Sequence, residues 1–376
     1  MDSMEWVDVI TRENLLLLSL LPKLNIDKFQ FLTQRFDLSS KQMSSLNSEA
    51  LTTLGFDQQQ TGLIQSAICS PHYQRAINWH QPERYQYVIT YADSQYPAML
   101  KEIARPPYAL LVKGNCKLLN TPQIAIVGSR NPSASGNQIA RQFASQLTLV
   151  GITITSGLAM GVDASAHLGA LDAKGSTVAV LGCGIDVIYP KRNRDIYAQI
   201  VDQGGLLVSE FFPGTQAKAS HFPRRNRIVS GLSFGTLVVE AARRSGSLIT
   251  ARTALEQNRD VFAVPGNVLN TNAAGCNYLI QQGAKLVTSV EDILDEYQHL
   301  IVQPPNDIRK TVKKSAISPL ASDTLLDSVE FDVTALDVIA ERNKLPVHAV
   351  MAALLEYELR GLVAAVPGGY IKLRGK

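Results

Sequence analysis

The sequence of 376 residues has no apolar run long enough to cross a membrane. Its four cysteines stand far apart, without a CxxC pair or a cysteine–histidine metal-ligand spacing, so we expect neither disulfides nor a metal site. Acidic residues occupy the N-terminal segment 1–24, where a secretory signal carries basic ones. These absences predict a cytoplasmic protein without a membrane segment.

Motifs of the common cofactor-binding and catalytic classes are also absent. There is no GxxxxGK[ST], no GxSxG and no HExxH, and the glycine that follows Gly128 is Gly136, which breaks the GxGxxG spacing of dinucleotide sites. Asp163 and His167 lie one helical turn apart, and we interpret them as a helix-start acid and a structural histidine. We therefore expect a protein that is not an enzyme and that has no cofactor.

One segment contains basic residues but no acidic ones. No aspartate or glutamate occurs between Phe211 and Val239, whereas the same segment contains Lys218, His221, Arg224, Arg225 and Arg227. The net charge of the whole chain is only +3, so this local imbalance is more informative than the total. One-signed charge on a protein surface favours an anionic ligand.

Short apolar runs alternate with helix-length segments through the middle of the chain. Continuously apolar strands joined by helices predict a Rossmann-like, doubly wound, mostly parallel α/β sheet with helices on both faces. The expected strands are 124–127, 152–155, 177–181, 206–209, 236–240, 260–265 and 285–287.

Different patterns flank this sheet. Residues 1–80 show helix-period leucines and predict a helical domain of SAM or helix-hairpin-helix type, followed by the Rossmann-like domain at 81–300. Residues 301–323 are rich in proline and lysine and predict a linker. Residues 324–376 read as helix, turn, helix and a hairpin around Pro-Gly-Gly, which predicts a winged helix. Its own small core is expected to contain Val347, Val350, Met351, Leu354 and Leu355.

Four segments near the expected strand ends suggest a binding crevice. The first, "IAIVGSRNPSASG", is a strand, a tight glycine turn at Gly128 and a helix start, where backbone N–H groups attract anions and Arg130 adds a guanidinium. The others are "SGLAMGVDASAH", "GCGIDVIYPKRNR" and "KASHFPRRNRIVSGLS". Strand exits of open α/β sheets line one side, so we expect a shared crevice that binds an anionic backbone. Phe222 could stack on a base or belong to the core.

These segments together resemble the DNA processing protein A (DprA, also called Smf) family. The resemblance rests on "VGSR", "SGLAMGVDASAH", "GCGIDVIYPKRN", "HFPRRNRIVSGLS", "ARRSGSLITA", "NRDVFAVPGN" and "GCNYLIQQGAKLV" in this order. It implies a homodimeric single-stranded-DNA-binding protein of natural transformation and DNA recombination that protects incoming strands and helps to load the RecA recombinase.

The resemblance also implies residue roles. The expected DNA-binding residues are Gly128, Ser129, Arg130, Ser156, Gly157, Lys191, Phe222, Arg224, Arg225, Asn226, Arg227 and Ser247. The expected dimer interface contains Cys276, Leu279, Ile280, Leu286 and Val287.

Two features leave alternatives open. The sheet also resembles nucleotide phosphoribohydrolases, although "LSFGTLVVEA" lacks their PGG and shifts their acid to Glu240. The winged-helix segment has six basic and seven acidic residues, a formal charge of −1, and its second helix carries Glu356 and Glu358. A protein contact or a structural role is therefore favoured there over reading of a DNA groove.

Overall fold

The computed structural model describes residues 12–21, 43–297 and 324–373. The chain divides into two compact units, 1–300 and 301–376, which are described one at a time. In the part of the chain that the structure describes, no helix is long and apolar enough to cross a membrane.

The first unit is built on one sheet of nine strands in the order β1-β2-β6-β5-β4-β3-β7-β8-β9. All adjacent strands from β6 to β9 pair in parallel, and only β2 runs antiparallel to both of its neighbours. The expected mostly parallel α/β sheet is thus confirmed. The strands are β1 (Gln86–Thr90), β2 (Ala109–Gly114), β3 (Gln123–Val127), β4 (Thr153–Ser156), β5 (Thr177–Leu181), β6 (Leu206–Ser209), β7 (Gly235–Val238), β8 (Asp260–Ala263) and β9 (Lys285–Leu286).

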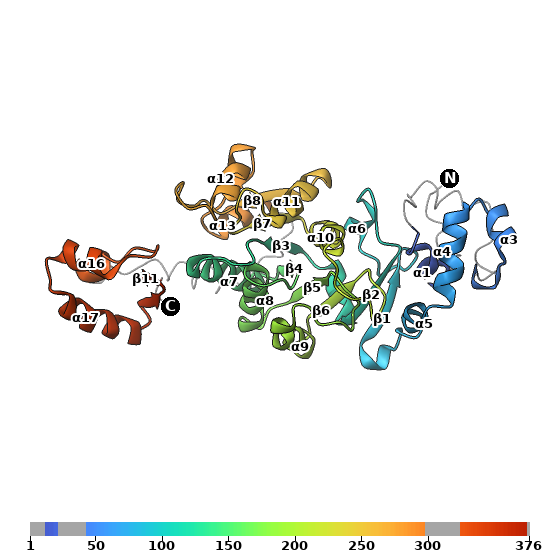
Figure 1. The fold of residues 1–376 in the computed structure, drawn as a ribbon, viewed down its shortest axis with the longest axis horizontal. Coiled ribbons are helices and arrows are strands. Elements are labelled where there is room, and N and C mark those ends of the chain that lie inside the picture. The colour runs from blue at the N-terminus through green and yellow to red at the C-terminus, as the bar shows by residue number, and fades with distance from the viewer. Residues whose placement is uncertain (1–11, 22–42, 298–323, 374–376) are drawn as a thin grey trace. The chain divides into compact units, whose positions relative to one another are not determined.

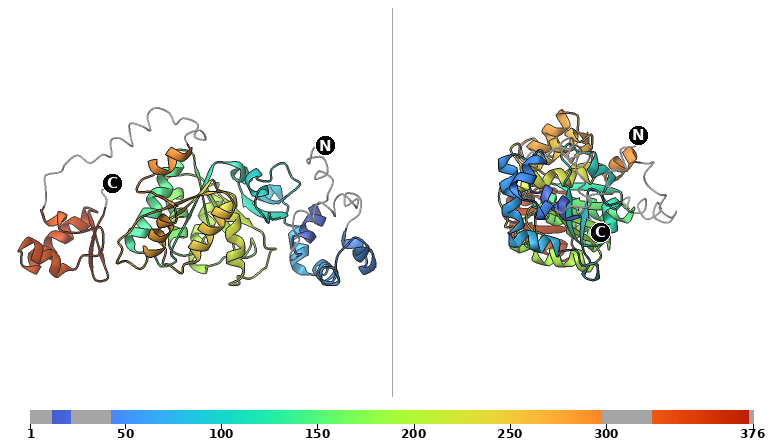
Figure 2. Two further views of the ribbon diagram at one scale, coloured as in Figure 1. Left: turned by 90° about the horizontal axis from the view of Figure 1, so that it is seen from above. Right: turned by 90° about the vertical axis from the view of Figure 1, so that its right-hand side faces the viewer.

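Helices cover both faces of this sheet, as Figures 1 and 2 show. Successive side chains of a strand point to opposite faces, so Ile124 and Ile126 of β3 pack on one side and Ala125 and Val127 on the other. One face carries α7 (Ala134–Leu149), α8 (Val162–Asp172), α9 (Arg194–Asp202) and α13 (Glu291–Leu294). The other carries α6 (Ala98–Lys101), α10 (His221–Gly231), α11 (Gly246–Glu256) and α12 (Ala274–Gln281).

The strand order fixes where a ligand can bind. From β3 the chain proceeds outward through β4, β5 and β6, and then returns to the other side of β3 with β7. Such a reversal leaves a crevice beyond the carboxyl ends of the two central strands, which is the usual ligand position in open α/β sheets. Here it lies between the loops that follow β3 and β7.

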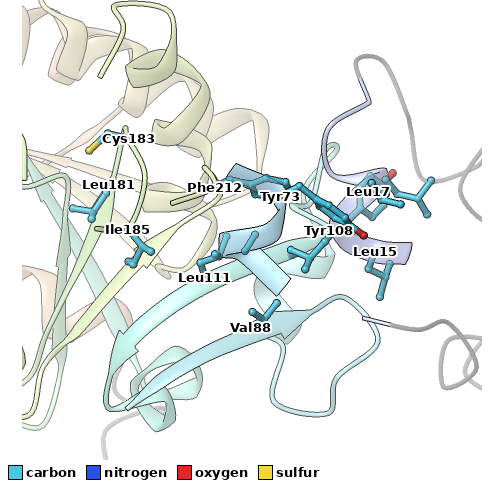
Figure 3. Close-up of a cluster of buried hydrophobic side chains, with 14 of the residues drawn as sticks. Leu15, Leu17, Tyr73, Val88, Tyr108, Leu111, Leu181, Cys183, Ile185 and Phe212 are labelled. Carbon is cyan, nitrogen blue, oxygen red and sulfur yellow. The ribbon is translucent and has the colours of Figure 1, made fainter. Parts of the chain in front are cut away.

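The N-terminal helices lie beside the β1–β2 edge of the same sheet. They are α1 (Arg12–Leu18), α3 (Ser48–Thr53), α4 (Gln58–Ile68) and α5 (Pro71–Ile77). In Figure 3, Leu15, Leu17 and Tyr73 belong to one apolar cluster with Leu111 of β2 and Phe212, and the Tyr73 and Phe212 rings lie 6.3 Å apart. The helical segment and the sheet therefore share a hydrophobic core, while a domain boundary at residue 80 stays a prediction.

The second unit is a small winged helix. It contains α15 (Thr324–Asp327), α16 (Leu336–Asn343), α17 (Val347–Leu359) and a hairpin of β10 (Val363–Val366) with β11 (Gly369–Lys372). The expected winged-helix pattern is confirmed. Gly368 has φ +97°, a left-handed value that only glycine adopts readily, and it lets the hairpin turn.

The predicted core of this winged helix is correct in part. Val350 and Leu354 are fully buried and pack with Ile339 and Tyr357. Val347, Met351 and Leu355, however, are 41, 50 and 59% exposed. Helical spacing alone does not distinguish the inward face of α17 from its flank, and the prediction joined two adjacent apolar stripes into one.

Candidate nucleic-acid interface

A pocket of about 430 Å³ opens at the expected place, beyond the carboxyl ends of β3 and β7. The loop after β3, the exit of β4, the helix α10 and the start of α11 line it. Its walls contain Gly128, Ser129, Arg130, Gly157, Asp163, Phe222, Arg225, Asn226, Ser245, Gly246 and Ser247, among others. Residues distant in sequence are therefore brought together around one concave site.

The helix α10 divides the basic motif between two sides. Phe222, Arg225, Asn226 and Val229 line the pocket, and these positions share one face because three- and four-residue steps return to the same side of a helix. The segment "HFPRRNRIVSG" is thus helical. The helical geometry directs Arg224 and Arg227 away from the pocket wall.

Arg224 and Arg227 point to an acid of the protein itself. Arg224 Nε lies 2.9 Å from Glu210 Oε2, and Arg227 Nη2 pairs with Glu210 Oε1. The Glu210 side chain is only 4% exposed. The two arginines do not line the pocket wall, and their assignment as DNA-binding residues stays a prediction. Sequence inspection missed these ion pairs because Glu210 immediately precedes the acid-free segment.

Arg225 is buried at the base of the pocket. It donates a hydrogen bond of 2.6 Å to the carbonyl oxygen of Gly157 and another to that of Val180, and so joins the ends of β4 and β5. Burial raises the pKa of nearby Asp163, and Arg225 opposes that shift. Asp163 also accepts hydrogen bonds from the backbone N–H groups of Gly157 and Ala159. Arg225 therefore supports the site instead of presenting its charge to a ligand.

His167 lies on the same helix as Asp163 and fits the structural interpretation. Its ring is fully buried, and its Nδ1 lies 2.7 Å from the hydroxyl of Thr177. Burial lowers the pKa of His167 to about 3. A neutral, enclosed imidazole cannot reach a ligand in the pocket.

Arg130 has a different environment. It is exposed at the pocket wall and forms no ion pair with any residue in 12–21, 43–297 or 324–373. Its guanidinium carbon lies 5.6 Å from the centre of the Phe222 ring, within the range of a cation–π contact. The pocket thus combines one free cation with an aromatic ring.

The start of α7 is already occupied by an acid of the chain. Glu240 accepts hydrogen bonds from the Ser133 backbone N–H at 2.8 Å and from its hydroxyl at 2.5 Å. A side chain at Gly136 would approach the Glu240 carboxylate to 2.6 Å, so the glycine makes room for this cap. The prediction that the helix after "VGSR" offers a free anion site is wrong, because a carboxylate of the protein takes it.

The start of α11 is more open. Ser245, Gly246 and Ser247 line the pocket, and a Cβ added to Gly246 would meet no atom within 4 Å. The Ser245 hydroxyl accepts a hydrogen bond from the Ser247 N–H, and the two hydroxyls lie 2.7 Å apart. Of the predicted residues, Ser247 therefore belongs to the pocket wall, and Ser245 is a neighbour that the prediction missed.

Two further predicted residues lie outside the pocket wall. Ser156 is fully buried, and its hydroxyl donates to the carbonyl oxygen of Ile126 at 2.6 Å, so it joins two strands and does not face a ligand. Lys191 begins the short helix η5 (Lys191–Asn193) and is exposed. Asp163 lines the pocket, so the pocket wall contains an acid although the segment from Phe211 to Val239 has none.

The predicted dimer residues also fall into two groups, one buried in the protomer and one with exposed surface. Cys276 and Val287 are fully buried in the protomer and Leu279 is 7% exposed, so these three belong to its core and have almost no surface to offer a partner. Leu286 is 45% exposed, and Ile280 is half-buried. In the predicted interface, Leu286 and Ile280 are therefore the residues with surface available to contact a partner.

Among the described residues, no cluster of three or more His, Cys, Asp or Glu could hold a metal ion. Fold and site together define a Rossmann-like α/β protein whose switch-point pocket presents a free arginine, an aromatic ring and serine-lined backbone. Residues 87–298 match the family model of DNA recombination-mediator protein A, and residues 311–369 match the DprA winged helix domain. The chain belongs to the DprA/Smf family, which confirms the resemblance stated above.

Three relatives illustrate this membership. Protein Smf of Escherichia coli (strain K12) is 48% identical over 288 residues, which are 75% of this chain and 76% of the relative. The X-ray structure of DprA from Streptococcus pneumoniae superposes with a TM-score of 0.62 at 36% identity, covering 76% of this chain and 98% of the other. A DprA structure from Helicobacter pylori, described for its single-stranded DNA binding mode, has a TM-score of 0.51 at 30% identity, covering 56% and 96%.

Proposed function

We propose that this protein binds single-stranded DNA in the pocket beyond β3 and β7. The observation that carries the proposal is the free guanidinium of Arg130 against the Phe222 ring at the wall of that pocket. A guanidinium suits phosphate oxygens, and an aromatic ring stacks on any base. The Helicobacter pylori relative, whose structure is described for single-stranded DNA binding, supports the same assignment.

The shape of the site favours a single strand over a duplex. A concave pocket of about 430 Å³ can receive a base only if that base is unstacked and unpaired. Phosphate contacts carry no base code, so sequence preference should be weak. Arg130, Asn226, Ser247 and the backbone at Ser129 and Gly246 are the proposed contacts, and Lys191 adds a cation outside the pocket.

We further propose that the protein is not an enzyme. The rival reading, a nucleotide phosphoribohydrolase, needs a free acid on this sheet, and Glu240 is its candidate. The Glu240 carboxylate instead caps α7 through Ser133, and its residue is 8% exposed. The geometry does not favour hydrolysis of a nucleotide. Release of free base from AMP by the purified protein would contradict this reading.

The biological role follows from family membership and belongs to the same proposal. The protein would act in the cytoplasm during natural transformation, protect incoming single strands and help to load RecA. A homodimer through Leu286 and Ile280 would place two DNA sites on one strand. Direct binding to RecA, measured with and without single-stranded DNA, tests the partner assignment.

The central test is a titration of fluorescently labelled dT20 and of a 20-base-pair duplex, followed by anisotropy over a series of salt concentrations. We expect clear preference for dT20. If about four phosphates are neutralised per protomer, the logarithm of affinity should fall against the logarithm of salt with a slope of roughly −3. Equal affinity for the duplex, or no salt dependence, would contradict the proposed function.

A further inference from the structure

An exposed tyrosine extends the aromatic surface of the pocket. Tyr189 lies in the segment between β5 and η5, and its ring is 5.6 Å from that of Phe222 with an angle of 35° between the planes. Tyr189 is 49% exposed, although a tyrosine ring usually buries most of its apolar surface. It is not part of the pocket wall, and it precedes exposed Lys191 by two residues.

Phe222 has little freedom to move. A side chain at Gly182 would approach the Phe222 ring to 2.7 Å, so the ring lies directly against the backbone there. Arg130 lies over the same ring at 5.6 Å. Phe222 is thus a fixed, partly exposed wall of the pocket, and the neighbouring Tyr189 ring adds a second, more exposed aromatic surface.

We propose that Tyr189 is a second base-stacking position for single-stranded DNA. This inference rests on the proposed function of the pocket. One nucleotide places its base at Phe222 and its phosphate at Arg130, and a neighbouring nucleotide stacks its base on Tyr189 near Lys191. The two aromatic rings lie 5.6 Å apart, with Arg130 over the Phe222 ring and Lys191 two residues after Tyr189, which matches the alternation of base and phosphate along a strand.

The competing explanation is that Tyr189 only supports Phe222 by packing. Three variants of the full chain separate the two roles. Tyr189→Ala removes the ring, Tyr189→Leu keeps apolar contact with Phe222 without a π face, and Tyr189→Phe keeps the ring. Phe331→Ala is the matched control, because Phe331 is a similarly exposed aromatic residue, at 51%, in the winged-helix unit.

Binding to labelled dT20 and to an abasic strand of equal length is measured for each variant by anisotropy. A lost base stack should weaken dT20 binding about tenfold in Tyr189→Ala and in Tyr189→Leu. Affinity for the abasic strand should stay within about twofold, since that strand has no base to stack. Tyr189→Phe should recover most of the dT20 affinity, and Phe331→Ala should match the wild type.

Two results would overturn the proposal. Equal weakening of dT20 and abasic binding, or wild-type dT20 affinity in Tyr189→Leu, would assign Tyr189 to packing alone. Failure of the wild-type protein to bind dT20 would instead contradict the proposed function itself, so the two failures are distinguishable. Circular dichroism of each variant checks that the fold is intact.

Discussion

The cations of the "HFPRRNR" helix and those of the neighbouring strand exits differ in their partners. Arg224 and Arg227 pair with Glu210, and Arg225 holds the carbonyl oxygens of Gly157 and Val180. Arg130 and Lys191 have no acidic partner among the residues that the structure describes. The most strongly basic stretch of the sequence is thus largely committed to the protein itself, and less conspicuous residues remain free for a ligand.

Basic residues of the winged helix are also paired within the protein. Arg342, Arg360 and Lys372 all pair with acids of their own unit, namely Glu330, Glu356 and Asp327. A high count of basic residues therefore predicts an anion site poorly in this chain. What matters is whether a cation is left unpaired at a concave surface.

The largest expected effect is on stability. Arg225→Met removes a buried cation and leaves Asp163 buried without it, which should destabilise the protein by about 3–5 kcal/mol. Urea unfolding followed by circular dichroism measures the change. Asp163→Asn in the same chain should recover part of the loss, because it removes the uncompensated charge. Full stability of Arg225→Met would show that Arg225 is not a structural residue.

Arg130→Ala, unlike Arg225→Met, should weaken DNA binding and leave stability unchanged. Loss of a charge-assisted contact costs about 1.5–3 kcal/mol, which weakens DNA binding about tenfold to a hundredfold. Stability should not change, since Arg130 is exposed. Anisotropy with dT20 and thermal melting are the measurements, and Arg252→Ala, at an exposed arginine of α11 outside the pocket wall, is the control. Wild-type affinity would make Arg130 an ordinary surface charge.

The distinction between committed and free residues can also be tested at the proposed dimer interface. Leu286→Glu should give a folded monomer, because Leu286 is exposed, whereas Leu279→Glu should misfold, because Leu279 is core. Loss of the second linked site should weaken binding to a long strand about tenfold and leave a short strand unaffected. Sedimentation velocity and circular dichroism follow the two variants. A Leu286→Glu protein that remains dimeric would exclude this interface.

Lys191→Ala should weaken dT20 binding about threefold to fivefold, less than Arg130→Ala. An ammonium group is a point charge without the planar fork of a guanidinium, and Lys191 lies outside the pocket wall. The effect should shrink at high salt, as expected of an exposed charge. The control is Lys117→Ala, which removes an exposed lysine from the segment after β2. An effect larger than that of Arg130→Ala would reverse the proposed ranking.

The smallest effect is expected from removal of the winged helix. A chain that ends at Asp323 should bind dT20 within about threefold of the full chain, because the described arginines of that unit are already paired. The same anisotropy titration tests this. A loss of more than tenfold would mean that the winged helix contributes to DNA binding despite its formal charge of −1.

The sheet could be predicted from sequence because its signal is local. Buried parallel strands are short and continuously apolar, and β3, β5 and β6 lie within one residue of the predicted ranges. The contacts of charged side chains, in contrast, join residues that are far apart in the sequence. Glu240 reaches Ser133 across 107 residues and Arg225 reaches Gly157 across 68, so the sequence could not reveal which groups bind these charged side chains.

The shared core around Phe212 has a consequence for how the chain can be cut. His72 Nδ1 lies 2.7 Å from the carbonyl oxygen of Pro213, and Tyr73 packs on Phe212, in the segment between β6 and α10. A fragment starting at residue 81 would expose Phe212 and Leu111 to water and free the segment that leads into the pocket-lining helix. Solubility and binding of such a fragment would then report the loss of a supporting surface, even though no residue that touches DNA had been removed.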